Sequence, residues 1–116
     1  MSAVITNEYG DIIIDKDVVA KIANKSAMEC YGLVGMASFK NGFTELLTKN
    51  RGSKGLNVEI EDNRISLELS VIIEYGTRVS TVAENIMDRV KYDTEMMTGL
   101  EVEHISIKVA GVRVEK

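Results

Sequence analysis

The feature that most constrains this fold is an alternation of apolar and polar residues over positions 56–73. The apolar members are Leu56, Val58, Ile60, Ile65, Leu67, Leu69, Val71 and Ile73. Asp62 and Asn63 interrupt the pattern with a turn signal. Successive side chains of a strand point to opposite faces, so each strand has one apolar and one polar face. The pattern predicts an antiparallel hairpin that packs on a core with one face and meets water with the other.

A long amphipathic helix is predicted after this hairpin, over residues 78–97. Gly76 ends the preceding strand, Thr77 is placed to cap the helix, and Gly99 is a stop of the left-handed type. The expected apolar stripe consists of Val79, Val82, Ala83, Ile86, Val90 and Met97. A last strand follows, and its apolar phase changes across Gly111 as at a β-bulge.

The N-terminal part begins with an expected flexible tail over residues 1–9. Ile12, Ile13 and Ile14 form a β-branched run that predicts a short strand on a buried surface. Asp15 can cap a helix over residues 16–31, with Gly32 as its stop. The stripe expected to pack against the sheet contains Val18, Val19, Ile22, Ala23, Ser26 and Cys30.

The middle of the chain carries shorter signals. Residues 33–39 are typical of a strand, residues 40–42 of a turn and residues 51–55 of a loop. Phe43, Leu46 and Leu47 recur at helical spacing, which favours a short helix over residues 43–49 against the alternative of a return strand.

Together these elements predict the order β-α-β-(short α)-β-β-α-β. Helices that follow strands, with a one-sided hairpin between them, indicate an α+β fold. We expect a mostly antiparallel sheet of about four to five strands, with both long helices on one face. At 116 residues the chain has the length of one domain, which we place at residues 10–116.

Composition narrows the classes of function. The net charge of −4 disfavours a general nucleic-acid binder, which needs a basic surface. Cys30 is the only cysteine and fits a reducing compartment. Residues 1–9 lack the features of a signal peptide, and no apolar run reaches the roughly 20 residues of a membrane span. We therefore expect a cytoplasmic protein without direct membrane insertion.

The residues offer little catalytic chemistry. His104 is the only histidine and is expected on the wet side of a strand, and Cys30 is expected on a packing stripe. One histidine and one distant cysteine do not make a zinc site, and no serine lies in a nucleophile elbow. The strand glutamates are typical of a solvated sheet face. We expect no enzyme activity, no metal and no cofactor.

Three segments invite a binding interpretation, each with a plainer alternative. Tyr75, Gly76, Thr77 and Arg78 place a hydroxyl, a cation and free N–H groups at a helix start, which suits an anionic group, although self-capping by Thr77 is the alternative. The loop from Gly52 to Gly55 matches the Gly-x-x-Gly of KH-type RNA-binding domains, or is a turn. The methionines near the end of the helix predicted over residues 78–97 form either an adaptable binding surface or part of the core. They are Met87, Met96 and Met97.

Several short pieces, in order, resemble the alkaline shock protein family of Gram-positive bacteria. They span residues 10–114 and include Gly10-Asp11-Ile12-Ile13-Ile14, Tyr31-Gly32-Leu33-Val34-Gly35, Tyr75-Gly76-Thr77-Arg78-Val79, Met97-Thr98-Gly99-Leu100 and Val109-Ala110-Gly111-Val112. The resemblance implies a non-enzymatic cytosolic protein of cell-envelope stress and homeostasis that binds other proteins, including a membrane-anchored partner in some members. It supplies no catalytic residues. The chain lacks the extended charged C-terminal tail of some members.

The expected function is therefore protein–protein interaction, with self-association through the sheet edges, because an exposed edge is a template for pairing. A module for a small ligand or anion at residues 75–78 is the alternative. Binding of single-stranded RNA through residues 52–55 is a further one.

Overall fold

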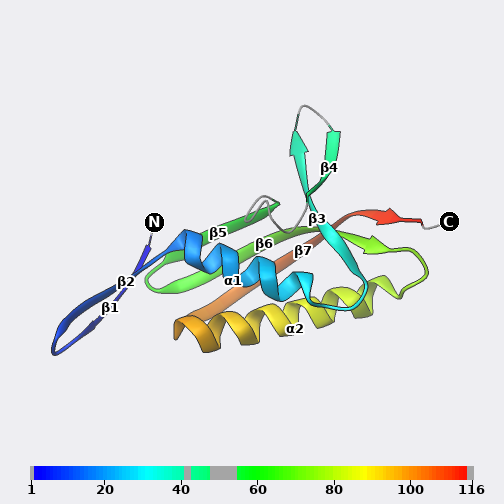
Figure 1. Ribbon diagram of the computed structural model, residues 1–116. Helices are drawn as coiled ribbons and strands as arrows, with labels where there is room; N and C mark the ends of the chain where they lie inside the picture. The colour runs from blue at the N-terminus through cyan, green and yellow to red at the C-terminus, as the bar shows by residue number, and fades with distance from the viewer. Residues whose placement is uncertain (1, 41–42, 48–54, 115–116) are drawn as a thin grey trace.

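The computed structural model describes residues 2–40, 43–47 and 55–114 (Figure 1). The first half contains β1 (Ser2–Asn7), β2 (Gly10–Asp15), α1 (Lys16–Met28), β3 (Leu33–Lys40) and β4 (Phe43–Leu47). The second half contains β5 (Leu56–Glu61), β6 (Arg64–Glu74), α2 (Val79–Thr98) and β7 (Glu101–Arg113). The α+β class and the mostly antiparallel pairing are confirmed.

Strand β6 lies at the centre of the main sheet. One of its edges pairs with β7 along the whole strand, in parallel. Its other edge is shared, because β5 pairs with residues 64–69 and β3 with residues 71–73, both antiparallel. β4 extends the sheet beyond β3, and β1 and β2 form a separate antiparallel ribbon.

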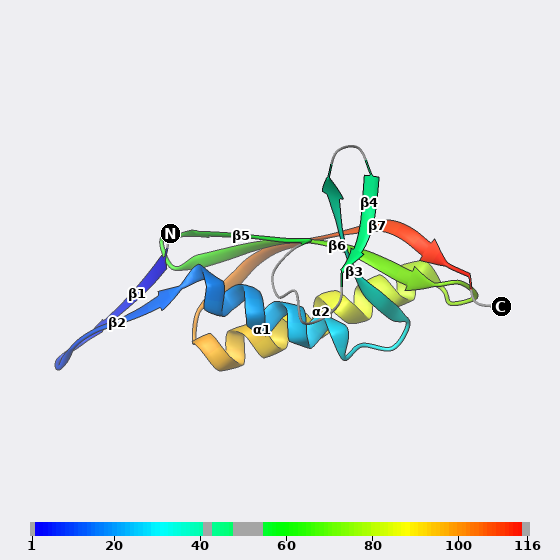
Figure 2. The same cartoon turned by 45° about the horizontal axis from the view of Figure 1, so that its top comes forward.

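Both helices cover the same face of this sheet, as expected (Figure 2). α1 packs on β5 and β3, α2 packs on β7, and the helices contact each other. The core lies between the layers, and its largest fully buried side chains include Met36, Ile65, Leu67, Leu69, Ile73 and Ile86. The odd-numbered positions of β6 are buried, which confirms the alternation seen in the sequence.

Three local signals are confirmed in detail. Asp62 and Asn63 both have positive φ, 52° and 62°, as a tight hairpin turn requires. Gly99 ends α2 in the left-handed conformation, and its N–H donates to the carbonyl of Glu95. The β6–β7 register skips Ala110, so a bulge lies beside Gly111 where the apolar phase changes.

The segment expected as a short helix is a strand. Residues 43–47 form β4, antiparallel to β3, and the remaining residues of that prediction lie outside the described part of the chain. Apolar residues at i, i+3 and i+4 are compatible with either structure over so short a stretch, and here pairing with β3 decides. The turn expected at residues 40–42 also falls largely outside the described residues.

The N-terminal expectations need two corrections. Residues 2–7, placed in a flexible tail, form strand β1. The isoleucine run does form a strand, β2, but Ile12 and Ile13 are exposed rather than buried, because the β1–β2 ribbon projects from the body of the molecule (Figure 1).

The helix boundaries and stripes also differ from the sequence prediction. α1 ends at Met28, three residues early, and Asp15 occupies its N-cap position without a side-chain cap hydrogen bond. Val18 is exposed, whereas Ala20, Asn24 and Ala27 are buried. α2 starts at Val79, and its buried stripe is Val82, Ile86, Val90, Thr94 and Thr98, with Val79 and Met97 exposed.

Thr94 and Thr98 continue the α2 stripe but differ in hydrogen bonding. The Thr98 hydroxyl donates to the carbonyl of Thr94 at 2.6 Å and accepts the N–H of Leu100 at 3.1 Å. The Thr94 hydroxyl is fully buried and has no partner among the described residues.

We expect Thr94→Val to leave the free energy of unfolding unchanged or to raise it by up to about 1 kcal/mol, since an unsatisfied buried hydroxyl costs about 1–3 kcal/mol. The matched change Thr98→Val should lower it by about 1–2 kcal/mol, because the N–H of Leu100 loses its acceptor. Urea unfolding followed by circular dichroism measures both. A clear destabilisation by Thr94→Val would show that its hydroxyl is used.

Candidate interaction surfaces

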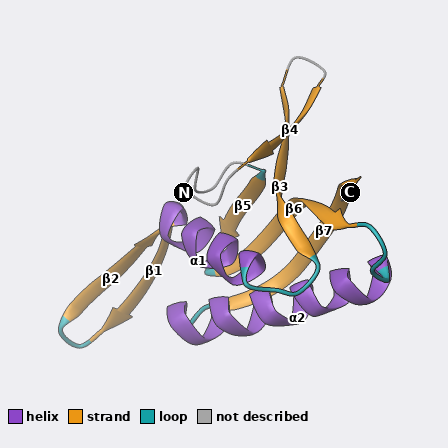
Figure 3. Ribbon diagram, turned by 45° about the vertical axis from the view of Figure 1, so that its right-hand side comes forward, coloured by secondary structure: helices purple, strands orange, loops and turns teal. Residues whose placement is uncertain are grey.

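One candidate surface is the β1–β2 ribbon, residues 2–15, which projects from the body of the molecule and which we call the N-terminal arm (Figure 3). Val4, Ile12 and Ile13 are 43%, 51% and 68% exposed, and Tyr9 at the tip is 91% exposed. The register sets Val4 opposite Ile13, and Ile5 opposite Ile12. Residues directly opposite share a face, so both faces of the arm carry β-branched side chains.

The base of the arm is fixed to the body of the molecule. The Asn63 side chain accepts the N–H of Val4 at 3.1 Å and donates to the carbonyl of Val4 at 2.8 Å. Ala3 is fully buried beside this pair. The Asn63 amide therefore acts toward β1 as a neighbouring strand would, and it ties the arm to the β5–β6 turn.

A second surface is a groove between α2 and β7, which we call the edge groove. Its volume is about 580 Å³, and it is lined by Glu84, Met87, Asp88 and Lys91 of α2 and by residues 102–105 of β7. Among the described strands β7 pairs only with β6, so its other backbone edge borders this groove. Val102 and Ile105 are buried at its base, whereas Glu84, Asp88 and Glu103 are exposed.

Glu95 stands at one end of β7. Its carboxylate accepts the backbone N–H of Val102 at 2.9 Å and lies 3.1 Å from the ammonium of Lys91. The hydrogen bond from Val102, with the Lys91 charge, lowers the pKa of Glu95 because both stabilise the ionised form. A side chain thus supplies the acceptor for the start of β7.

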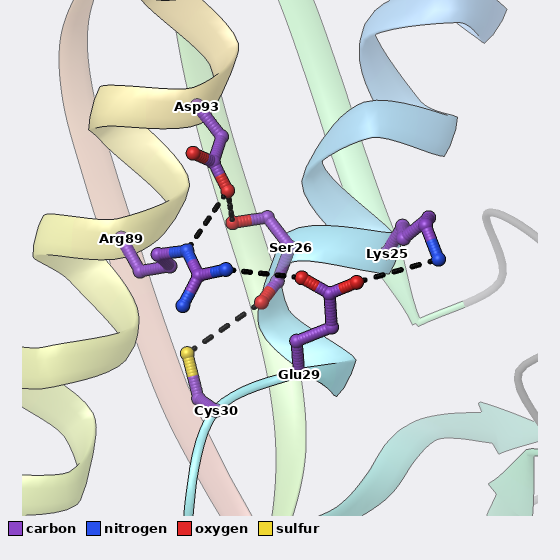
Figure 4. Close-up of polar contacts among 6 residues, drawn as sticks. All are labelled: Lys25, Ser26, Glu29, Cys30, Arg89 and Asp93. Carbon is purple, nitrogen blue, oxygen red and sulfur yellow. Dashed lines mark hydrogen bonds and ion pairs between the residues drawn. The ribbon is translucent and has the colours of Figure 1, made fainter.

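A polar network joins the two helices (Figure 4). Asp93 accepts hydrogen bonds from the hydroxyl of Ser26 at 2.8 Å and from Arg89 Nε at 3.1 Å. Arg89 also reaches Glu29 at 3.0 Å, and Lys25 pairs with Glu29 at 3.3 Å. These contacts join α1 to α2 through polar and charged side chains.

Cys30 lies beside this network, and its thiol donates to the carbonyl of Ser26 at 3.5 Å. Partial burial raises the pKa of the Cys30 thiol, and the charges of Asp93 and Glu29 add to this effect, although Arg89 opposes it. The thiolate is therefore disfavoured, as expected for a packing residue.

The predicted anion site lies in the turn between β6 and α2. Thr77 does not cap the helix: its hydroxyl donates backwards to the carbonyl of Glu74 at 2.7 Å, and Arg78 occupies the N-cap position without a side-chain cap bond. Tyr75 is exposed, and its N–H donates to the carbonyl of Arg113. Gly76 has a φ of 97°. The four residues form a turn in which Tyr75, Gly76 and Arg78 are exposed and Thr77 is half-buried.

The other candidates are dispersed. His104 is exposed on β7, where the open sheet face meets the edge groove, far along the chain from Cys30. Within the described residues no group of three or more His, Cys, Asp and Glu side chains could hold a metal ion. No helix in the described part is long and apolar enough to cross a membrane. Gly52, Ser53 and Lys54 of the proposed RNA loop lie outside the described residues.

Solved structures with the same fold include "MamM-CTD 215-293", which aligns with 87% of this chain and 100% of its own length at a TM-score of 0.52 and 11% identity. Another, a MamM CTD variant, gives 0.51 at 12% identity, with 87% and 96% covered. At such low identity the likeness concerns the fold alone. The fold and surfaces define a small α+β domain that presents a projecting arm and an open sheet edge.

The chain belongs to the alkaline shock protein family, described as having a cell envelope-related function, whose sequence pattern matches residues 4–114. It is 42% identical over 117 aligned positions to the uncharacterized protein YloU of Bacillus subtilis, covering 98% of both chains. It is 35% identical to the uncharacterized protein Spy1614 of Streptococcus pyogenes, covering 98% of this chain and 97% of that one.

A more distant relative is a stress response regulator gls24 homolog of Streptococcus pyogenes, 26% identical over 92% of this chain but only 61% of its own length. The resemblance drawn from the sequence is thereby confirmed. So is the expected link to the cell envelope and to stress response at the level of the family.

The sequence analysis expected association through sheet edges but located neither of these two candidate surfaces. A local signal for the arm was present, because two β-branched runs, Val4-Ile5 and Ile12-Ile13-Ile14, flank the turn at Glu8 and Tyr9. The edge groove has no local signal, since it exists only where the start of β7 returns alongside the middle of α2.

We expect the stability given by Glu95 to depend on pH. Its folded pKa is lowered, so its contribution is fully present above its ordinary pKa and is lost as the pH falls through the folded value. Wild type should therefore exceed Glu95→Gln in unfolding free energy at neutral pH, with the difference shrinking in acid. Urea titrations of both proteins at several pH values measure this; a constant difference would contradict it.

Proposed function

We propose that this protein has no catalytic role and acts in the cytoplasm, within cell-envelope stress and homeostasis, by binding other proteins, itself included. Family membership supports the envelope setting. The exposed N-terminal arm and the edge groove are the surfaces through which it would act. A membrane-anchored protein is a proposed partner, because the family resemblance implies one.

The arm is the observation that carries the self-association. A two-stranded ribbon is marginally stable in water by itself, and this one exposes apolar side chains on both faces. Because β2 pairs only with β1 among the described strands, its second edge is open for hydrogen bonding. An exposed apolar edge of this kind is suited to pairing with another strand.

We propose a second copy of β2 as that strand. The sequence Asp11-Ile12-Ile13-Ile14-Asp15 reads the same in both directions around Ile13. A two-fold axis through Ile13 would pair the strands antiparallel and set Ile12 against Ile14 of the second copy, as an isologous interface requires. It would also set Asp11 against Asp15, a like-charge pair that opposes association.

The test is the molar mass in solution, by light scattering over a range of concentrations. We expect wild type to associate and Ile13→Thr to remain monomeric at concentrations about tenfold higher. Ile13 is 68% exposed, so the monomer should stay folded. Salt should strengthen the association, because it screens the repulsion between Asp11 and Asp15.

Val112→Thr is the matched control, since Val112 is 46% exposed on β7, away from the arm. It should associate as wild type does. Self-association through the arm is excluded if wild type is monomeric throughout, or if both variants weaken association equally.

An anion-binding module is the second candidate, and the start of α2 favours it. The first turn of α2 contains no acidic residue, its N-cap lacks a side-chain cap, and Arg78 is exposed there. Free N–H groups at a helix start attract anions.

In a thermal-shift series with inorganic phosphate, a bound anion would raise the melting temperature of wild type but not of Arg78→Ala. Arg113→Ala, a nearby cation change on β7, serves as the control. No phosphate-dependent difference between wild type and Arg78→Ala would remove this candidate.

A further inference from the structure

We propose that the edge groove is a docking site for an extended segment of a partner protein in which basic residues recur at every second position, and that this segment adds as a strand to β7. The proposal rests on the proposed function only in assuming protein partners. It concerns a different surface from the arm, with different elements and a different charge.

The backbone of β7 supplies the first argument. β7 is 13 residues long and pairs with β6 alone among the described strands. Its bulges lie at Glu103 and Ala110, so residues 104–109 keep an unbroken register with residues 66–71 of β6. This regular stretch presents an ordered row of backbone groups to an incoming strand, the mode of binding known as β-strand addition.

The hydrogen bond from Val102 to Glu95 is the second argument. A carboxylate oxygen accepts this backbone N–H at 2.9 Å from outside the sheet, where a carbonyl of a further strand would be suitable. The backbone at the start of β7 therefore already donates a hydrogen bond to an acceptor outside the sheet. An added strand would begin beyond Glu95 and follow β7 from there.

Charge supplies the third argument, and it selects the partner. Glu84 and Asp88 lie four residues apart on α2, and like charges at this spacing repel each other and destabilise a helix. Neither has an ion pair within the described residues, and both line the groove. The charge of Lys91 is directed to Glu95 at 3.1 Å, and Glu103 reaches Arg64 only at 3.9 Å.

The groove therefore has uncompensated carboxylates along its walls and apolar side chains at its base. A bound strand points alternate side chains to opposite faces. The side chains on the face toward α2 would lie beside Met87, Glu84 and Asp88, so basic residues at these alternate positions would reach the two carboxylates (Figure 2). A segment with a basic residue at every second position therefore complements the α2 wall of the groove, whereas an acidic segment would be repelled.

The test uses a short peptide, blocked at both ends, that alternates lysine and valine. A second peptide of the same composition has its lysines grouped together. Titrated into the isotope-labelled full chain, the alternating peptide should shift the backbone amide resonances of residues 104–109. It should bind about tenfold more tightly than the grouped peptide, or about 1.4 kcal/mol.

Two charge variants separate groove binding from general attraction. Glu84→Gln with Asp88→Asn should weaken the alternating peptide about tenfold. Glu59→Gln with Glu68→Gln removes the same charge from the open sheet face and should change the affinity less than about twofold. Equal losses in the two variants, equal binding of the two peptides, or unshifted resonances over residues 104–109 would each overturn the proposal.

The same titration in the Ile13→Thr variant separates this proposal from self-association. Peptide binding should be unchanged there, and salt should weaken it, because opposite charges attract across the groove. Arm pairing should respond to salt in the reverse direction. Loss of one property therefore leaves the other measurable.

Discussion

The pairing of β6 on both edges is the constraint on which the rest of the structure depends. β7 occupies one edge completely, and β5 and β3 divide the other between them. Since β5 and β3 lie end to end against the same strand, their backbones meet near Gly55. The carbonyl of Gly55 accepts the N–H of Ser70 at 2.9 Å, and an added Cβ on Gly55 would collide with the carbonyl of Ala37. Gly55 also has a φ of +82°, so glycine is favoured at this junction both by the close contact and by the backbone conformation.

Because both edges of β6 are paired, the unpaired strand edges of the sheet lie at its periphery. β7 is an edge strand although it is parallel to its neighbour, an arrangement that is usually covered on both sides. Here α2 covers one face and the groove remains beside it. The N-terminal arm projects from the β5–β6 turn, where Asn63 holds it. Both candidate surfaces therefore lie at the periphery of the main sheet.

Local signals in the sequence were sufficient for elements whose form depends on their own residues. The alternation around Asp62 and Asn63 predicted the hairpin, Gly99 the end of α2, and Gly111 the position of a bulge. Such signals failed where a partner distant in sequence decides. Residues 43–47 fit a helix or a strand, and β3 makes them a strand. Ile12 and Ile13 suit a buried sheet, but no second layer covers them.

Helix capping shows the same difference between what local residues predict and what the fold contains. Thr77 and Asp15 are residues that favour a helix N-terminus, yet the Thr77 hydroxyl bonds to Glu74 instead and Asp15 makes no cap bond. Thr94 and Thr98 were not part of the predicted apolar stripe because they are polar, although both are buried on α2. Parallel pairing of β7 and the groove beside it required knowledge of where α2 ends and in which direction the chain returns.

The two surfaces use different physics and share no residue, so one copy could use both. The arm is apolar and would join identical chains, whereas the groove is acidic and would select a basic segment. A pair of copies joined through β2 would present two grooves. A partner with two basic segments would then bind the pair more tightly than either copy alone, because the second contact forms at a high effective concentration. Self-association would in this way control how strongly the groove holds its partner, without any change in the groove itself.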